Sequence, residues 1–297
     1  MDEHELAWAA GFFDGDGWAA LVRPKRRRTG QPIAQINQSD PDVVPEVLRR
    51  FRDAVGVGSI RGPKREAGLI DSYRWSASSR GDVTRAGVLL APWLCGQKRG
   101  QFATALGAKL PDRRDDYLLP WGGGFFDAEG WTSLSDHRTH AGFKMIELGA
   151  GQSGSADEVP EELVRIHAVA GVGNIHGPYV QKGAVELIYR WRVGAAKDAR
   201  VALHLIQPWI GPVKRRQASR AFAVIDSQTD LQRGRPDWGS HKTHCIHGHE
   251  YAVARLKPYL NRSPNGVERR DSKQCLACVR ELARRRYAAR QRKIGGI

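Results

Sequence analysis

Cysteine is scarce in this chain of 297 residues, which contains four, three of them after residue 244. So few cysteines, so placed, exclude a disulfide framework and favour a metal site near the C-terminus. Long apolar runs are also missing, because the best one, residues 86–95, is about half the length of a membrane helix. The first residues are acidic and lack the basic segment of a targeting signal. We therefore expect a cytoplasmic protein, nucleoid-associated in a bacterial or phage setting, with no membrane partner.

Acidic side chains are outnumbered. The chain has 32 Asp and Glu against 47 Lys and Arg, which gives a net charge of +15 and a pI near 10.0. This balance attracts polyanions. The excess is concentrated in residues 241–297, where 14 basic and 4 acidic residues give a net of +10. The length of 297 residues predicts about two domains, and a hydrophobic fraction of 41% is typical of globular proteins.

The sequence repeats itself. Residues 8–18 return as residues 121–131 with seven of eleven identical, and residues 44–63 return as 159–178 with eleven of twenty identical. The offset between matching residues stays between 113 and 116 along the chain. Chance similarity between two amphipathic domains would not keep this order and spacing, so we interpret the chain as two copies of one unit of about 115 residues.

Both copies predict the same elements, in an α+β fold with antiparallel sheets. Each begins with a helix that ends at the glycine after the second acid of the motif, Gly17 or Gly130. In the first copy we expect strands at 18–25, 32–38, 58–63 and 72–77, and helices at 40–55, 81–91 and 98–108. In the second copy the first strands are expected at 131–137 and 142–148. The predicted domains are residues 1–110, 111–227 and 241–297, with a linker at 228–240.

The two motif helices carry small residues, then two phenylalanines, then acids. Small residues such as Gly11 and Gly124 let two helix backbones approach closely. Helices packed side by side would bring four carboxylates together at their C-terminal ends, those of Asp14, Asp16, Asp127 and Glu129. Such a cluster becomes favourable if divalent cations bind among the oxygens. The alternative is a pair of surface helix ends with solvated acids.

Residues 9–17 (AAGFFDGDG) and 122–130 (GGGFFDAEG) resemble the two motifs of a single-chain LAGLIDADG homing endonuclease, over about residues 1–225. The resemblance implies two pseudo-symmetric units with saddle-shaped sheets and the motif helices paired at the interface. It implies that Asp16 and Glu129 bind catalytic Mg²⁺, with two or three ions in the site. It also implies that Asp14 and Asp127 brace the helix ends. Both motifs depart from the family pattern by starting with small residues in place of leucine, and the second has Glu for Asp.

Three further residues match catalytic positions of the family. Lys98 and Lys214 lie where the family has a basic residue beside each scissile phosphate, and Gln38 lies where a polar residue contacts metal-bound water. Gln152 is only a candidate for the counterpart of Gln38, because the register of the repeat is disturbed near residues 149–155. Without the matched register, each lysine reads as an ordinary cation at a helix start.

The chemistry predicted from these groups is metal-dependent hydrolysis of one phosphodiester in each strand of double-stranded DNA. The resemblance implies a monomer that cuts a long, asymmetric target across the minor groove. The rival class is a non-cleaving protein of the same fold, either a maturase that binds intron RNA or a DNA-binding regulator. Intact acids and lysines in both copies favour cleavage.

DNA recognition is expected on the strands, because a β-ribbon fits the major groove and alternate residues face one way. The better candidates are Arg74, Arg190 and Arg192. Weaker candidates are Gln31, Gln35, Arg61 and Lys144. Arg26, Arg27 and Arg28, at a hairpin tip, are expected to contact phosphates. The alternative for any one of these residues is a solvated surface position.

The C-terminal segment contains Cys245, His249, Cys275 and Cys278, two close ligand pairs separated by a loop. This spacing is typical of a tetrahedral Zn²⁺ site and resembles treble-clef zinc modules. His244 and His247 are alternatives to His249, and unliganded residues in a basic tail are the alternative to the site. A helix expected at 279–292 carries Arg284, Arg285 and Arg286, which we assign to phosphate contact. Cys95, outside this cluster, is expected to be a buried apolar residue.

Overall fold

The computed structural model describes residues 2–23, 29–40, 43–65, 68, 70–136, 144–180, 187–233, 256–263 and 266–273, with side chains to residue 228. The chain divides into two compact units, Met1–Gln228 and Thr229–Ile297, which are described separately. No helix in these ranges is both long and apolar enough to span a membrane.

The first half of the larger unit contains four helices and four strands. They are α1 Glu3–Asp16, β1 Gly17–Val22, β2 Gln31–Ser39, α2 Glu46–Val55, β3 Ser59–Lys64, β4 Ser72–Ala77, α3 Arg80–Leu90 and α4 Gly96–Leu106. The strands form an antiparallel sheet in the order β1-β2-β4-β3. The strand pairs β1–β2 and β3–β4 that the sequence predicts are confirmed.

The second half repeats these elements in the same order. They are α5 Leu118–Glu129, β5 Gly130–Asp136, β6 Lys144–Gly154, α6 Glu161–Ala170, β7 Asn174–Val180, β8 Leu187–Val193, α7 Ala196–Ile206 and α8 Pro212–Arg233. The second sheet is antiparallel with the equivalent order, β5-β6-β8-β7. The duplication inferred from the sequence is therefore a duplication of the fold.

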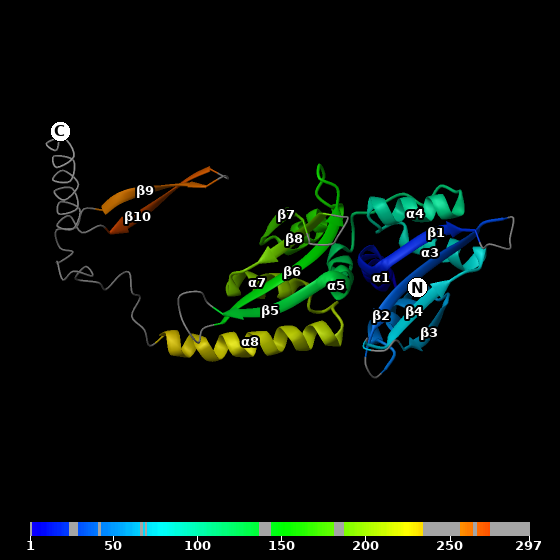
Figure 1. The fold of residues 1–297 in the computed structure, drawn as a ribbon, viewed down its shortest axis with the longest axis horizontal. Helices are drawn as coiled ribbons and strands as arrows, with labels where there is room; N and C mark the ends of the chain where they lie inside the picture. Colours follow the sequence, from blue (N-terminus) through cyan, green and yellow to red (C-terminus); the bar gives the residue numbers. More distant parts are fainter. Residues whose placement is uncertain are drawn as a thin grey trace, which may run out of the picture. The chain divides into compact units, whose positions relative to one another are not determined.

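Helices α1 and α5 pack against each other between the two sheets (Figure 1). The backbones are so close that a Cβ at Gly11 would lie 2.0 Å from the Trp121 carbonyl oxygen. A Cβ at Gly124 would lie 1.9 Å from the Trp8 carbonyl oxygen. The phenylalanine pairs of both motifs are fully buried and pack into the hydrophobic core beneath each sheet. Both expectations for the motif helices, close approach and aromatic packing, are confirmed.

Helix α2 begins at Glu46, so the predicted start at Asp40 is wrong. The Asp40 carboxylate accepts a hydrogen bond from the Val43 N–H at 3.1 Å, and the Asp40 N–H donates to the Asp71 carbonyl at 3.0 Å. Asp40 thus bonds to Val43 and Asp71 and does not cap the helix. Pro45 then precedes the first helical residue.

Strand β6 continues to Gly154, six residues beyond the predicted end at Leu148. Residues 149–154 are mostly small and have low strand propensity, yet they pair with β8 without a register shift. The ring of Trp131 covers Gly149 so closely that a Cβ there would lie 2.6 Å from it. Tertiary packing thus overrides local propensity in this segment. At the other end of the half, α8 continues to Arg233, into the segment expected to be a linker.

The smaller unit contains a hairpin of β9 Leu256–Ser263 and β10 Gly266–Lys273, in which Leu256 pairs with Lys273. The predicted zinc ligands Cys245, His249, Cys275 and Cys278 lie outside the described residues, as does the predicted helix with Arg284, Arg285 and Arg286.

Candidate active site

Two acidic residues end the packed helices, Asp16 on α1 and Glu129 on α5. The helix ends stay close, because a Cβ at Gly15 would lie 3.0 Å from the Cγ of Glu129. Burial raises the pKa of Asp16 to about 6. Burial and then the neighbouring charge of Asp16 raise the pKa of Glu129 to about 7. Two partly buried carboxylates whose charged forms are disfavoured by burial form a site that a cation would stabilise.

A lysine reaches the end of each motif helix. Lys98 on α4 is buried, and its ammonium donates to the carbonyl oxygen of Gly17 at 2.6 Å. Lys214 on α8 donates to the carbonyl oxygen of Gly130 at 2.5 Å, and burial lowers the pKa of its ammonium. Both ammonium charges lower the pKa of Asp16 and of Glu129. The structure therefore brings together the two acids and two lysines singled out in the sequence.

Gln38 and Gln152 occupy equivalent strand positions. Gln38 on β2 pairs with Tyr73, and its side-chain amide donates to the Asp16 carboxylate. Gln152 on β6 pairs with Tyr189, the residue equivalent to Tyr73. Gln152 lines a cavity of about 350 Å³ together with Glu129. The strand register thus makes Gln152 the counterpart of Gln38.

The earlier acid of each motif accepts hydrogen bonds from the backbone at the start of a helix that carries one of the two lysines. The Asp14 carboxylate accepts from the Cys95 N–H, at the N-cap of α4, at 3.0 and 3.1 Å. The Asp127 carboxylate accepts from the Gly211 N–H, just before α8, with both distances 2.8 Å. These contacts agree with the bracing role that the resemblance implies.

Each of these aspartates also accepts from a tryptophan of the opposite motif helix. Trp121 Nε1 on α5 donates to Asp14 at 2.8 Å, and Trp8 Nε1 on α1 donates to Asp127 at 3.1 Å. All four side chains are buried. The partners are 107 and 119 residues apart, so nothing in the local sequence indicates these bonds.

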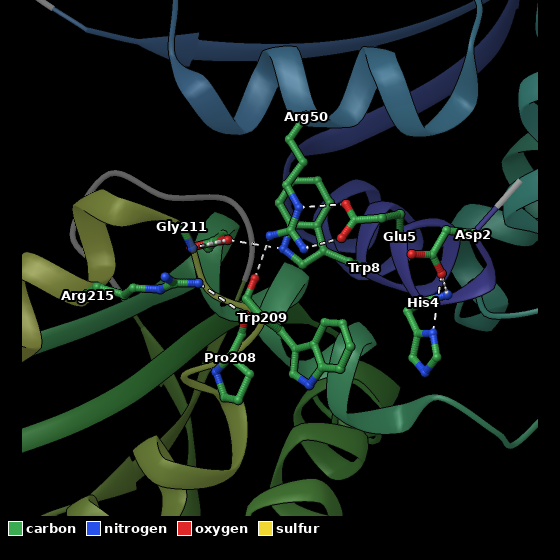
Figure 2. Close-up of polar contacts among 10 residues, drawn as sticks. Asp2, His4, Glu5, Trp8, Arg50, Pro208, Trp209, Gly211 and Arg215 are labelled. Atoms are coloured by element: carbon green, nitrogen blue, oxygen red, sulfur yellow. Dashed lines mark hydrogen bonds and ion pairs between the residues drawn. The ribbon is translucent and has the colours of Figure 1, made fainter.

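An arginine covers each of these tryptophans. The Arg50 guanidinium lies 4.0 Å from the ring centroid of Trp8, ion-pairs with Glu5 and donates to the Trp209 carbonyl at 2.6 Å (Figure 2). Arg165 repeats this arrangement, with its guanidinium 4.5 Å from the Trp121 ring and a hydrogen bond to the Trp93 carbonyl. Sequence reasoning missed both arginines, although Arg50 and Arg165 match within the repeat.

The repeat differs at one buried cluster. Oxygen and sulfur atoms of Asp14, Cys95 and Glu162 lie within 4.8 Å of one another. The equivalents of Cys95 and Glu162 are Gly211 and Val47, which pack together instead. Burial and then the charge of Glu162 raise the pKa of Asp14 to about 7, and the neighbouring Arg165 offsets only part of this rise. The expected burial of Cys95 is confirmed.

The strands present alternate residues on the side of each sheet away from the helices, here called the outer face. Arg74 on β4 is exposed between buried Tyr73 and Trp75 and pairs across strands with exposed Arg61. Arg190 on β8 is the exposed equivalent of Arg74 and lies 5.9 Å from the Tyr179 ring centroid. Arg192 is half-buried and ion-paired with Glu147. These four arginines share the outer-face alternation predicted from the sequence.

Other recognition candidates are placed differently. Gln35 belongs to the outer face but is 8% exposed, and Gln31 donates to the Ser78 carbonyl at 2.5 Å. Lys144 lies on the opposite face of β6 from Glu147, and it ion-pairs with Asp136 at 2.7 Å. Arg26, Arg27 and Arg28 lie outside the described residues.

The outer faces also contain residues that the sequence reasoning did not select. Asn37 accepts a hydrogen bond from Arg74 at 2.8 Å, and His176 pairs across strands with Arg190. Glu147 is a carboxylate on the same face and ion-pairs with Arg192. Two-residue alternation from Gln35 would have selected Asn37, and the match with Arg61 in the repeat would have selected His176. Glu147 lies on the opposite face of its strand from Lys144, so only the strand pairing places it on the outer face.

No family model and no curated protein matches this chain. Solved structures do match. The LAGLIDADG meganuclease I-AabMI bound to uncleaved DNA has a TM-score of 0.57 and 15% identity, over 78% of this chain and 93% of that chain. The homing endonuclease I-GzeII in complex with its DNA target has a TM-score of 0.55 and 15% identity, over 76% and 92%. The meganuclease I-CpaMI bound to uncleaved DNA has a TM-score of 0.56 and 14% identity, over 78% and 95%. The larger unit therefore has the fold of the two-domain, single-chain LAGLIDADG endonucleases.

Proposed function

We propose that this protein is a site-specific DNA endonuclease that hydrolyses one phosphodiester in each strand of a long, asymmetric target. The observation that carries the proposal is the pseudo-symmetric site. Asp16 and Glu129 lie at the paired helix ends, each near a lysine held at the same helix end. A binding protein has no need of coupled, partly buried carboxylates. The fold is shared with proteins solved in complex with DNA.

The donor set fits a hard divalent cation. Asp16 and Glu129 supply only carboxylate oxygens, and their pKa values are raised by burial and, for Glu129, by the charge of Asp16. A neighbour of the same fold, I-SmaMI, was solved with uncleaved DNA in the presence of calcium ions. We assign the site to Mg²⁺, which when bound would supply Lewis acidity at the phosphate and lower the pKa of coordinated water.

The remaining residues act around these carboxylates. The Gln38 amide orients the Asp16 carboxylate by its hydrogen bond. We assign the same orienting role to Gln152 beside Glu129, with which it lines a cavity. Lys98 and Lys214 place positive charge where negative charge develops on each phosphate. The lowered pKa of Lys214 also brings its proton exchange closer to neutral pH.

Sequence recognition falls to the outer faces. Arg74 and Arg190 are exposed on equivalent strands, and an arginine can donate two hydrogen bonds to a guanine edge in the major groove. The two outer faces carry different residues, such as Arg61 in one half and His176 in the other. Different residues in the two halves support an asymmetric target read by one monomer.

The C-terminal unit is proposed to bind one structural Zn²⁺ and to add phosphate contacts. In the β9–β10 hairpin, Leu256 pairs with Lys273. The first predicted ligand pair precedes Leu256 in the sequence and the second follows Lys273. A hairpin between two ligand pairs supports the zinc assignment, which measurement of zinc content by mass spectrometry would test.

The test of the endonuclease uses the full chain and a randomised duplex DNA library, incubated with Mg²⁺ or with Ca²⁺. We expect cuts at one long sequence with Mg²⁺ and loss of cutting in Asp16→Asn. Asp53→Asn is the matched control, because it changes an exposed carboxylate on α2 in the same way. Binding without cuts under both ions would refute the enzyme and favour a regulator, and tighter binding to structured RNA would favour a maturase.

A further inference from the structure

We propose that each half of this protein positions the catalytic lysine of the other half, with Trp8 and Arg50 serving Lys214, and Trp121 and Arg165 serving Lys98. The inference rests on the proposed nuclease function. It is carried by hydrogen bonds that cross the interface between the halves. These four side chains are positioning residues, because they act through the bracing aspartates and the backbone carbonyls that precede each lysine helix.

The first observation is that side chains of the first half hold the segment before α8. Trp8 Nε1 donates to Asp127 at 3.1 Å, and the same carboxylate accepts from the Gly211 N–H at 2.8 Å. Arg50 donates to the Trp209 carbonyl, two residues earlier, at 2.6 Å (Figure 2). Two side chains of the first half therefore hold the segment that precedes the helix of Lys214, Arg50 directly and Trp8 through Asp127.

The second observation is that side chains of the second half hold the segment before α4 in the equivalent way. Trp121 Nε1 donates to Asp14 at 2.8 Å, and Asp14 accepts from the Cys95 N–H. Arg165 donates to the Trp93 carbonyl, again two residues earlier. The same pattern of bonds thus occurs twice with the halves exchanged, which is what a pseudo-twofold axis produces when the bonds cross it.

The tryptophans are themselves held rigidly. Trp8 stacks on Phe12 with ring centroids 5.2 Å apart, and Arg50 lies 4.0 Å from the Trp8 ring centroid. Trp121 stacks on Phe125 at 5.4 Å, and Arg165 lies 4.5 Å from the Trp121 centroid. A stacked indole has one remaining polar group, the Nε1–H, and in both cases it points at the aspartate of the opposite helix.

The lysines stand at the end of this chain of contacts. Lys98 follows the Cys95 N-cap by three residues, and Lys214 follows Gly211 by three residues. Each ammonium donates back to the carbonyl oxygen of the glycine that ends the motif helix. A rotation of the helix start would move the ammonium, and displacements of about 1 Å can cost large factors in rate.

The test removes only the indole N–H, with Trp8→Phe and Trp121→Phe in the full chain, and measures single-turnover nicking of each strand of the cleaved target. Lys98→Met and Lys214→Met identify the DNA strand whose nicking depends on each lysine. We expect Trp8→Phe to slow the strand that depends on Lys214, and Trp121→Phe to slow the strand that depends on Lys98. The ratio of the two nicking rates should change about tenfold in each case, in opposite directions.

Trp75→Phe and Trp191→Phe are matched controls. Their Nε1 atoms donate to the Val57 and Val172 carbonyls at 3.0 and 2.9 Å, within one half. They should lower stability without changing the ratio of rates. Arg50→Met is a second variant, expected to act like Trp8→Phe.

The outcomes separate the two proposals. Absence of any cutting by the unmodified protein removes the nuclease function and this inference with it. If the unmodified protein cuts, but the tryptophan variants slow both strands equally or slow the strand of their own half, only the crossed positioning is overturned. Chemical unfolding of every variant distinguishes a shift in rate ratio from a general loss of folded protein.

Discussion

At the scale of single residues, the folded protein holds the two acids of the site where their charged forms are disfavoured. Burial raises the pKa of both Asp16 and Glu129, so ionisation of each carboxylate costs free energy in the folded protein. The folded protein binds protons more tightly than the unfolded chain, and its stability therefore falls as pH rises from the unfolded pKa values towards 6 or 7. Catalytic groups often carry such a cost in stability.

Asp16→Asn and Glu129→Gln should therefore stabilise the protein when divalent metal is absent. Removing an ionised carboxylate whose pKa is raised this far by burial should increase the free energy of unfolding by roughly 2 kcal/mol at pH ~8. The gain should shrink at pH ~5, where the folded carboxylates are protonated. Urea unfolding in EDTA at both pH values measures this, and equal stability of variant and parent at the higher pH would contradict it.

Gln38 and Gln152 make a second prediction at this scale. Gln38→Ala and Gln152→Ala should each slow nicking about tenfold, because each removes an amide beside an acid that we propose to be catalytic. Gln217→Ala, at an exposed position on α8, is the control and should cut normally. An unchanged nicking rate in Gln152→Ala would show that Gln152 does not share the role of Gln38, despite their equivalent strand pairing.

The sequence predicted the residues that belong to a motif and missed those that act at a distance. Asp16, Glu129 and the two lysines could be predicted from the resemblance to the family motifs, because both copies place them in the same register. The bonds of Trp8 and Trp121 could not be predicted, because their acceptors are over a hundred residues away and any buried tryptophan looks like core. The equivalent strand positions of Gln38 and Gln152 became visible only in the strand pairing, because small residues disturb the repeat near Gln152.

At the scale of elements, the packing of α1 on α5 depends on two glycines. A Cβ at Gly11 or Gly124 would lie about 2 Å from a backbone carbonyl oxygen of the facing helix, and a backbone atom cannot rotate away. Element boundaries were harder to predict than element identity. Helix α2 starts later than predicted, since Asp40 bonds to Val43 and does not cap the helix, and β6 runs long because β8 and Trp131 hold it.

Gly11→Ala and Gly124→Ala should each lower the free energy of unfolding by about 3 kcal/mol or more, since the helices must separate to admit a methyl group. Gly100→Ala is the matched control, because Gly100 lies inside α4 and a Cβ there would have open space around it. The control should raise stability by about 0.5 to 1 kcal/mol through lower backbone entropy in the unfolded chain. A Gly11→Ala variant as stable as Gly100→Ala would refute the close contact.

At the scale of the whole molecule, charge is divided unevenly between the two units. The larger unit carries the site and the outer faces, while residues 241–297 carry a net of +10. Binding by the C-terminal unit is therefore expected to depend strongly on salt and little on DNA sequence.

The triple variant Arg284→Gln, Arg285→Gln and Arg286→Gln should weaken binding to specific and unrelated duplexes alike. The slope of log affinity against log salt should fall in magnitude by about 0.9 for each phosphate that the variant no longer neutralises. Arg74→Gln is the contrasting variant and should mainly reduce discrimination between target and unrelated DNA. Titrations at several salt concentrations measure both, and a sequence-dependent weakening in the triple variant would contradict phosphate binding.

The crossed bonds also bear on how such a chain can evolve or be rebuilt. Each copy of the repeat supplies a donor that the other copy needs and accepts one in return. A recombinant that joins one half to a half from a relative inherits a tryptophan without its aspartate, or an aspartate without its tryptophan, unless both parents share the pair. Exchange of whole halves is therefore compatible only between lineages that have kept this reciprocal pair, and chimaeras designed to read new targets should be chosen by that criterion first.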